Sequence, residues 1–284
     1  MTDVVIVAHQ ERREASALAR AAVTWLESHG HRAFMPRTDA VELGLDDLAS
    51  DRPVAEAQLA LCIGGDGTVL RMVDLLDGAP VPIMAVNLGM LAYLTEVEPP
   101  AMTAALQRYF SGDCSVEHRM LLQVEVVRSG SQEASGSWRA LNEAVLEKEE
   151  SGHTVRLLVN IDDAPFMSYA ADGMIIATPT GSTAYSLSAR GPVISPQHRA
   201  MLLTPVSPHQ LFDRSLVLSP DETVEIEVAG HRGVVLTVDG SSVASLAAGD
   251  VVRCRPAVED AQFVCFGRRR FHQVLRAKFG LADR

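Results

Sequence analysis

Aromatic residues and positive charge are both scarce in this sequence of 284 residues. Phe, Trp and Tyr make up 5% of the chain, so a buried core must be built mainly from Ala, Val, Leu and Ile. The formal net charge is −11, whereas a protein that holds nucleic acid usually carries a basic excess, because phosphate contacts dominate that affinity. The composition therefore predicts a soluble globular protein with no nucleic-acid partner. We interpret the one dense basic run, Arg268–Arg270, as a solvated helix end.

Cysteine and long apolar runs are also limited. The four cysteines form no Cys-x-x-Cys pair, and the nine histidines form no His-Glu-x-x-His pattern, so we expect reduced thiols and no protein metal site. No apolar stretch reaches the ~18 residues that span a bilayer, and no signal peptide is visible. We therefore expect a cytoplasmic protein with no membrane partner. Backbone amides and a divalent cation can still hold phosphates on an acidic protein.

The first third of the sequence alternates strand and helix patterns. Val4–Val7 is a short, continuously apolar run, as expected for a strand buried on both faces. From Glu11 to His29 apolar residues recur at helical spacing, and Gly30 can cap that helix. Further strands are expected at 32–35, 59–63 and 81–86, and further helices at 68–76 and 99–110. This rhythm predicts an α/β domain with a parallel sheet over residues 1–114.

Beyond about residue 115 the pattern changes to short segments in which apolar and polar residues alternate. The expected strands include 121–127, 140–146, 155–161 and 223–228, with turn-forming residues between them. This pattern predicts an antiparallel, strand-rich second domain over residues 115–265. The last segment, 266–284, contains a helical pattern from Arg269 to Phe279 that could pack back on the first domain.

A glycine-rich turn with an acidic residue follows the strand expected at 59–63. Its sequence is Gly64-Gly65-Asp66-Gly67, and a helix is expected directly after it. Glycines let the backbone approach a ligand closely, and a helix start offers free amides that suit phosphate. A carboxylate would repel an anion, so Asp66 makes sense as a base for an attacking hydroxyl or as a magnesium contact. The turn is neither a Walker loop nor a Gly-x-Gly-x-x-Gly loop, and an ordinary strand-to-helix turn is the alternative.

The most unusual stretch runs from Asp172 to Tyr185. A short apolar strand is followed by hydroxyl residues around Gly181. Such a loop can offer hydroxyls, amides and an aromatic ring to a nucleoside. A nucleophilic Ser182 is disfavoured, because the Gly-x-Ser-x-Gly elbow of hydrolases is missing. The alternative is a polar loop that only caps a helix.

A polar pair, Asn142-Glu143, interrupts the apolar segment that is expected to form one strand over 140–146. Adjacent residues of a strand point to opposite faces, so one of the pair is expected to face inward or toward a cleft. A polar group buried there must find partners. An ordinary polar pair on an edge strand is the alternative.

These three motifs, in this order, resemble the NAD kinase family, and the match covers nearly the whole chain. It includes the turn Asn87–Gly89 after the fourth expected strand. The Gly-Gly-Asp-Gly turn alone is shared with diacylglycerol-, sphingosine- and phosphofructokinase-like enzymes. The resemblance implies an NAD kinase/diacylglycerol kinase-like fold. It also implies transfer of the terminal phosphoryl group of ATP or polyphosphate to the 2′-hydroxyl of the adenosine ribose of NAD, which gives NADP.

The same resemblance assigns roles to individual residues. Asp66 would be the general base that activates the 2′-hydroxyl. The nucleotide-binding residues would be Gly65, Gly67, Arg71, Asn142, Glu143, His153, Asp172, Thr183, Ala184, Tyr185, Ser186, Leu187 and Ser188. Mg²⁺ or another divalent cation would neutralise charge on the phosphates. A homodimer or homotetramer formed through the second domain is implied as well.

Three positions and one segment depart from the family's common pattern. His153 stands where Arg is common, and Ala170 where a larger or charged residue is common. Ser241 replaces a common Gln, and the segment Met90–Tyr93 lacks a second glycine that is often present. These changes leave Asp66 in place and bear on affinity and on the choice between NAD and NADH.

Two other functions fit part of the sequence. A lipid or sugar kinase could use the Gly-Gly-Asp-Gly turn, but it would have no use for the loop at 178–185 and would make no NADP. A nucleotide sensor on this fold would bind NAD without turnover and would tolerate Asp66→Asn. The three motifs together favour the NAD kinase.

Overall fold

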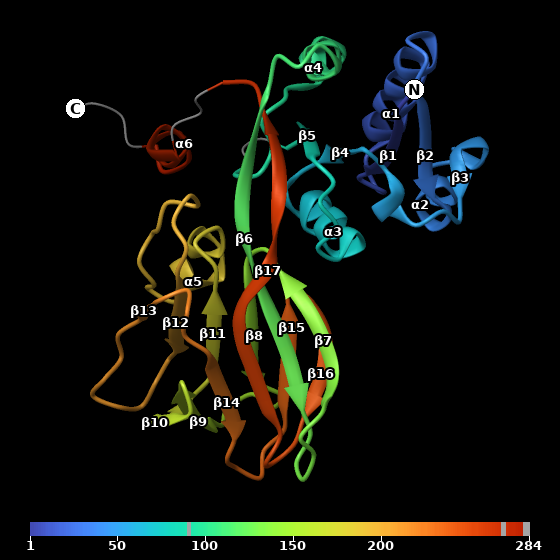
Figure 1. Cartoon of the computed structure of the whole chain (residues 1–284). Helices are drawn as coiled ribbons and strands as arrows, with labels where there is room; N and C mark the ends of the chain where they lie inside the picture. The colour runs from blue at the N-terminus through green and yellow to red at the C-terminus, as the bar shows by residue number, and fades with distance from the viewer. Residues whose placement is uncertain (90–91, 268–270, 281–284) are drawn as a thin grey trace. The chain divides into compact units, whose positions relative to one another are not determined.

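The structure, a computed structural model, describes residues 1–89, 92–267 and 271–280 (Figure 1). The chain divides into two compact units, residues 1–118 with 261–284, and residues 119–260. β6 (Ser115–Val127) leads from the first unit into the second, and β17 (Val251–Cys265) leads back. The basic run Arg268–Arg270 and the pair Met90-Leu91 lie outside the described residues.

The first unit is an α/β domain built on a parallel sheet. Its elements are β1 (Asp3–Ala8), α1 (Arg13–Ser28), β2 (Arg32–Pro36), α2 (Arg37–Glu42), η1 (Asp46–Leu48), β3 (Ala49–Ser50), η2 (Val54–Glu56), β4 (Leu59–Gly64), α3 (Asp66–Leu76), β5 (Ile83–Asn87), η3 (Pro99–Ala101), α4 (Met102–Phe110) and α6 (Phe271–Lys278). The strands lie in the order β5-β4-β1-β2-β3, and each neighbouring pair is parallel. The parallel α/β class expected from the sequence is confirmed.

In the central strands and the first helix of this unit, the buried residues follow the apolar pattern of the sequence. β1, β4 and β5 are buried at every residue, and each has a neighbouring strand on both sides. Such continuous burial is typical of inner strands in parallel sheets, whose two faces are both covered. In α1 the buried residues Ala15, Ala19, Ala22 and Leu26 form one stripe, and the opposite face is polar. Gly30 then takes a left-handed φ of 78° after the helix, where glycine is favoured.

The second unit consists of two largely antiparallel sheets. Its further elements are β7 (Ala134–Ala140), β8 (Glu143–Lys148), β9 (Val155–Ile161), β10 (Ala164–Ala171), β11 (Gly173–Ala177), η4 (Gly181–Thr183), α5 (Tyr185–Ser188), β12 (Met201–Val206), β13 (Leu216–Leu218), β14 (Val224–Val228), β15 (Val234–Val238) and β16 (Ser241–Leu246). One sheet has the order β13-β12-β11-β8-β15-β16. The other contains β10-β9-β14-β17, with β6 beside β17 and β7 beside β6. Side chains of both sheets form one apolar cluster, which confirms the expected strand-rich unit.

The segment 140–146 is not one strand, so that expectation was wrong. β7 ends at Ala140 and β8 begins at Glu143. Asp239, which lies near in space and far in sequence, accepts hydrogen bonds from the amides of residues 141–143, and this turns the backbone away from a regular ladder. The edge-strand alternative was also wrong, because β8 pairs with β11 on one side and β15 on the other.

Candidate functional site

The Gly-Gly-Asp-Gly turn joins the end of β4 to the start of α3. A Cβ on Gly64 would lie 2.0 Å from Oγ1 of Thr68, so close packing within the turn itself requires this glycine. The amide of Leu88 donates to the Gly64 carbonyl at 2.8 Å, which ties the turn to the loop after β5. By contrast, a Cβ on Gly65 or Gly67 would meet nothing within 4 Å. The protein has no packing reason for glycine at those two positions, and open space lies beside them.

Asp66 is held by the loop that follows β5. The amide of Tyr93 donates to Oδ2 at 3.0 Å, and the amide of Leu94 donates to Oδ1 at 2.9 Å. The side chain remains 33% exposed. Its place in the first turn of α3 is favourable for negative charge, because the helix dipole is positive there. A carboxylate fixed by two amides and open to solvent can accept a proton from a bound hydroxyl.

Arg71 lies one turn further along α3, and its guanidinium contacts Asp39 of α2. Asp39 is fully buried, and its Oδ2 has no hydrogen-bond partner among the described residues. A buried carboxylate needs a positive partner, so this ion pair is a packing contact of the first unit. The structure therefore gives Arg71 a partner within the protein, the carboxylate of Asp39.

In the second unit, Asp239 shapes the backbone at Asn142 and Glu143. Its carboxylate accepts the amides of Leu141, Asn142 and Glu143 at 2.7, 2.8 and 3.0 Å. Asp239 itself has a left-handed φ of 47°, which is uncommon outside glycine and asparagine or aspartate. In the sequence, Asp239-Gly240 is recognisable only as a turn-forming pair. A turn aspartate that can bond backbone amides was the signal for its further role.

Glu143 is the buried member of the polar pair, with 7% of its surface exposed. Its Oε2 has no hydrogen-bond partner among the described residues. Burial, and then the nearby charge of Asp239, raise the pKa of Glu143 to about 8, although a hydrogen bond from the Tyr185 backbone acts in the opposite direction. A carboxyl group with an unused buried oxygen is prepared to bond a polar ligand.

We expect Glu143→Gln to flatten the pH dependence of stability. The carboxyl of Glu143 has a usual pKa of 4.5, which applies to the unfolded chain, and about 8 when folded. Between these values the folded state keeps a proton that the unfolded state has released, so the free energy of unfolding falls as pH rises from 4.5 to 8. Thermal unfolding from pH 5 to 8.5 should show a shallower decline for Glu143→Gln than for the wild type. Glu147→Gln, on the same strand and less buried, is the control; equal slopes for all three proteins would contradict the assignment.

The loop after β11 packs directly on the backbone of Asn142. The amide of Thr178 donates to the Asn142 carbonyl at 2.8 Å. A Cβ on Gly181 would lie 2.1 Å from the same carbonyl oxygen, so only glycine allows this approach. Ser182 is fully buried, and its hydroxyl bonds the Pro179 carbonyl and the Ile194 amide. That hydroxyl is a structural link, in agreement with the view that Ser182 is no nucleophile.

The segment from Thr183 to Ser188 divides into inward and outward groups. Ser186 is fully buried, with its Oγ 3.1 Å from Oγ1 of Thr204. Tyr185 reaches back along the sheet, and its hydroxyl donates to Glu147 Oε1 at 3.2 Å. Burial, and then Glu147 and Asp172, raise the pKa of the Tyr185 hydroxyl. The structure thus brings Tyr185 close to Glu143 through its backbone and to Glu147 through its ring.

Of the remaining predicted residues of this unit, Asp172 lies near enough to Tyr185 that its charge adds to burial in raising the pKa of the Tyr185 hydroxyl. Asp172 precedes β11 and forms an ion pair with Lys148, a residue that belongs to none of the three sequence motifs. His153 is exposed in the turn between β8 and β9. Ser241 is exposed in β16, and Ala170 is half-buried in β10. Within the described part of the chain, His153, Ala170 and Ser241 form no hydrogen bond with Glu143.

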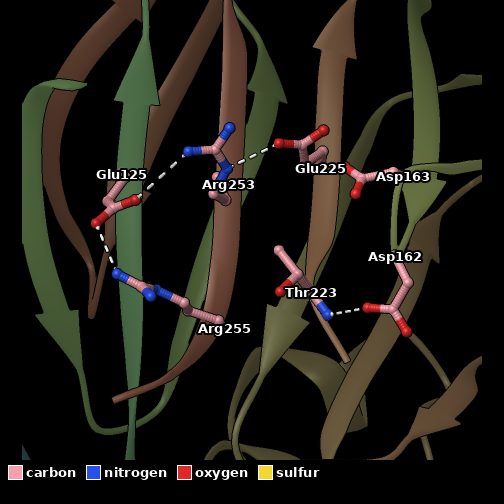
Figure 2. A pocket seen from close by; sticks show the side chains of 7 residues that line it. All are labelled: Glu125, Asp162, Asp163, Thr223, Glu225, Arg253 and Arg255. Atoms are coloured by element: carbon pink, nitrogen blue, oxygen red, sulfur yellow. Dashed lines mark hydrogen bonds and ion pairs between the residues drawn. The ribbon is translucent and has the colours of Figure 1, made fainter. Parts of the chain in front are cut away.

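A charged hollow of about 350 Å³ in the second unit contains none of the predicted residues (Figure 2). It is lined by Glu125, Asp162, Asp163, Thr223, Glu225, Arg253 and Arg255. Arg253 donates to Glu225 at 2.7 Å, and Arg255 donates to Glu125 at 3.2 Å (Figure 2). Because both guanidinium groups already have carboxylate partners, the hollow does not suit a phosphate-bearing ligand.

Within the described residues, no three His, Cys, Asp or Glu side chains form a group that could hold a metal ion. Of the helices in those same ranges, none is long and apolar enough to cross a membrane. None of the four cysteines, all of which are among the described residues, forms a disulfide, and Cys62 and Cys254 are buried.

Comparison with known proteins places this arrangement in one family. Residues 4–114 match the ATP-NAD kinase N-terminal domain, and residues 141–266 match the ATP-NAD kinase C-terminal domain. The chain is 37% identical over 280 residues to an NAD kinase of Heliobacterium modesticaldum, covering 98% of both chains.

Solved structures show the same likeness. A yeast NADH kinase complexed with NADH is 25% identical, with a TM-score of 0.91 over 100% of this chain and 89% of the other. An NAD kinase from Archaeoglobus fulgidus in complex with ATP is 21% identical and shares the fold, with a TM-score of 0.75 over 99% of this chain and 100% of the other. Both domain matches and the full-length relative lead to one conclusion: the chain belongs to the NAD kinase family.

Proposed function

We propose that this chain transfers the terminal phosphoryl group of ATP to the 2′-hydroxyl of the adenosine ribose of NAD. The observation that carries the proposal is the carboxylate of Asp66, which two amides fix and which stays open to solvent beside glycines without packing neighbours. Open space at Gly65 and Gly67 supports a ligand whose phosphates approach the backbone at a helix start. The ATP bound to the Archaeoglobus fulgidus enzyme supports ATP as the donor.

In the proposed reaction Asp66 accepts the proton of the 2′-hydroxyl. The hydroxyl oxygen forms a bond to the terminal phosphorus of ATP, and the bond from that phosphorus to its bridging oxygen breaks. ADP leaves with the electron pair, so the products are NADP, ADP and one proton. The protein contributes position and a fixed electrostatic environment, which are the main sources of catalysis in phosphoryl transfer.

A divalent cation fits this site as a companion of the phosphates. No group of three ligating side chains occurs in the described ranges, and magnesium in such enzymes is held largely by substrate phosphates and water. When bound, the ion would reduce the negative charge on the phosphates. The chain's own part is to hold the acceptor hydroxyl beside Asp66.

The dinucleotide is proposed to use polar groups of the second unit. Glu143, with its unused buried oxygen, would accept a hydrogen bond from a ribose hydroxyl or donate its own proton to one. Asn142, Asp172, His153 and the segment Thr183–Ser188 keep the nucleotide-binding roles that the family resemblance implies. For Ser186 that role would be structural, since its side chain is buried against Thr204.

The proposal is tested by incubating the protein with NAD, ATP and MgCl₂. We expect NADP and ADP in equal amounts, measured with an NADP-specific dehydrogenase and by chromatography, and no NADP when EDTA removes the metal. Replacing ATP with polyphosphate tests the alternative donor. ADP formation without NADP, with a lipid or sugar as the true acceptor, would reject the proposed function. So would NAD binding without turnover.

Two further expectations accompany this function. The family resemblance implies a homodimer or homotetramer that works in the cytoplasm. Light scattering on the purified chain should give a mass of two or four times 30.6 kDa. A monomer that retains full activity would show that assembly is not needed for the reaction.

A further inference from the structure

The C-terminal helix α6 belongs to the first unit and brings a lysine to the Gly-Gly-Asp-Gly turn. The ammonium of Lys278 lies 3.9 Å from Oδ2 of Asp66. It also lies 3.2 Å from the centroid of the Tyr93 ring. The Lys278 side chain is only 17% exposed, so its charge is partly removed from water at the point where it meets these two groups. Three segments that are far apart in sequence therefore form one cluster.

Each member of this cluster restrains another. Tyr93 donates its amide to Asp66, while its ring lies under the Lys278 ammonium. A cation over an aromatic face is attracted by the negative charge of the ring, and more strongly where water is excluded. Lys278 thus contacts Asp66 directly by charge and indirectly through the Tyr93 segment, whose amides hold both carboxylate oxygens.

We propose that Lys278 is a positioning residue for Asp66. It fixes the segment at Tyr93 and Leu94 and balances the carboxylate, so that Asp66 keeps one orientation toward the acceptor hydroxyl. This inference rests on the proposed function of Asp66. The alternative is a contact that only attaches α6 to the rest of the unit. The two differ in what happens when Asp66 no longer carries a charge.

A double-mutant cycle separates the positioning role from simple attachment. We expect Lys278→Gln to lower kcat for NADP formation about tenfold or more, with little change in the KM for NAD, because misplacement acts on the reacting geometry. Lys278→Arg keeps a cation that can sit over the Tyr93 ring and should recover to within about threefold of the wild type. In an Asp66→Asn background, Lys278→Gln should change kcat by less than about twofold, because residues that act as a unit are not additive.

The matched control is Arg276→Gln, which removes one positive charge from an exposed position of the same helix. It should stay within about twofold of the wild type. Wild-type kcat in Lys278→Gln, or the same fold loss in both Asp66 backgrounds, would overturn the positioning role. The Asp66→Asn rate must be measured above the background without enzyme, with enzyme concentration raised as needed.

Hydrogen exchange gives a second readout that needs no activity. The amides of Tyr93 and Leu94 should exchange faster in Lys278→Gln than in the wild type, and Arg276→Gln should leave them unchanged. Unchanged protection in Lys278→Gln would overturn the inference. A wild-type protein that makes no NADP, yet shows the expected exchange difference, would reject the proposed function and leave the contact of Lys278 with the Asp66 loop established.

Discussion

Asp66→Asn is expected to lower kcat for NADP formation about a thousandfold while the Kd for NAD changes by less than about threefold. Asparagine has nearly the same shape and can still accept the amide of Tyr93 or Leu94 with its one carbonyl oxygen. It cannot take a proton from the ribose hydroxyl, and loss of a positioned base costs about 10²–10⁴ in rate. Steady-state kinetics and calorimetric titration with NAD measure the two quantities.

The control for this substitution lies on the same helix. Asp74→Asn changes an exposed carboxylate of α3 and should leave both kcat and Kd unchanged. A fully active Asp66→Asn protein would reject the base. A loss of NAD affinity as large as the loss of kcat would instead assign Asp66 to binding, because an effect confined to the reaction lowers kcat alone.

Gly181→Ala is expected to lower the free energy of unfolding of the second unit by about 3 kcal/mol and to weaken NAD binding. The added methyl group would lie 2.1 Å from the Asn142 carbonyl oxygen. A backbone atom cannot rotate away as a flexible side chain can, so the loop or the Asn142 segment must move, and such overpacking costs about 1–3 kcal/mol or more. Thermal or denaturant unfolding, together with NAD titration, measures both effects.

Gly67→Ala is the variant to compare with Gly181→Ala, because it adds the same methyl group at a position with free space. A Cβ at Gly67 meets no protein atom within 4 Å, so stability should stay within about 0.5 kcal/mol of the wild type or rise slightly, since alanine favours helix. If phosphates approach this backbone, kcat/KM should still fall, because the methyl group occupies their space. Full activity in Gly67→Ala would mean that no ligand comes close to this backbone.

For Gly181→Ala, wild-type stability would contradict the prediction, because it would show that the loop can move away from the Asn142 carbonyl at little cost.

The clearest difference between expectation and structure concerns the segment 140–146. Its apolar residues predicted one continuous strand, yet the ladder breaks before Glu143 because Asp239 takes the amides of 141–143. Periodicity reports which residues are buried, and the expectation that one of the pair Asn142-Glu143 faces inward is met by Glu143. It does not report an acceptor that arrives from the turn between β15 and β16, 96 residues away in sequence. The site of greatest chemical interest in this unit is therefore where the local pattern was least informative.

Arg71 is a second residue whose contact could not be predicted from the sequence. The family resemblance assigned it to the nucleotide, whereas in the folded chain its guanidinium contacts the buried Asp39. A charged residue on a helix gives no sign in sequence of whether its partner is a ligand or a second side chain. The nucleotide role of Arg71 stays a prediction, and any ligand would have to share the guanidinium with Asp39.

The sequence by itself determined the α/β class of the first unit, the strand-rich class of the second, and the family. The structural class of each unit could be predicted because buried strands and helices require apolar residues at characteristic spacings along the chain, as in β1 and α1. The family could be read because three motifs occur in a fixed order. Only the tertiary structure decided that Asp239 shapes the backbone at Glu143, and that Lys278 from the last helix lies beside Asp66. Those contacts join residues that are 96 and 212 positions apart, and no local pattern encodes a partner at that distance.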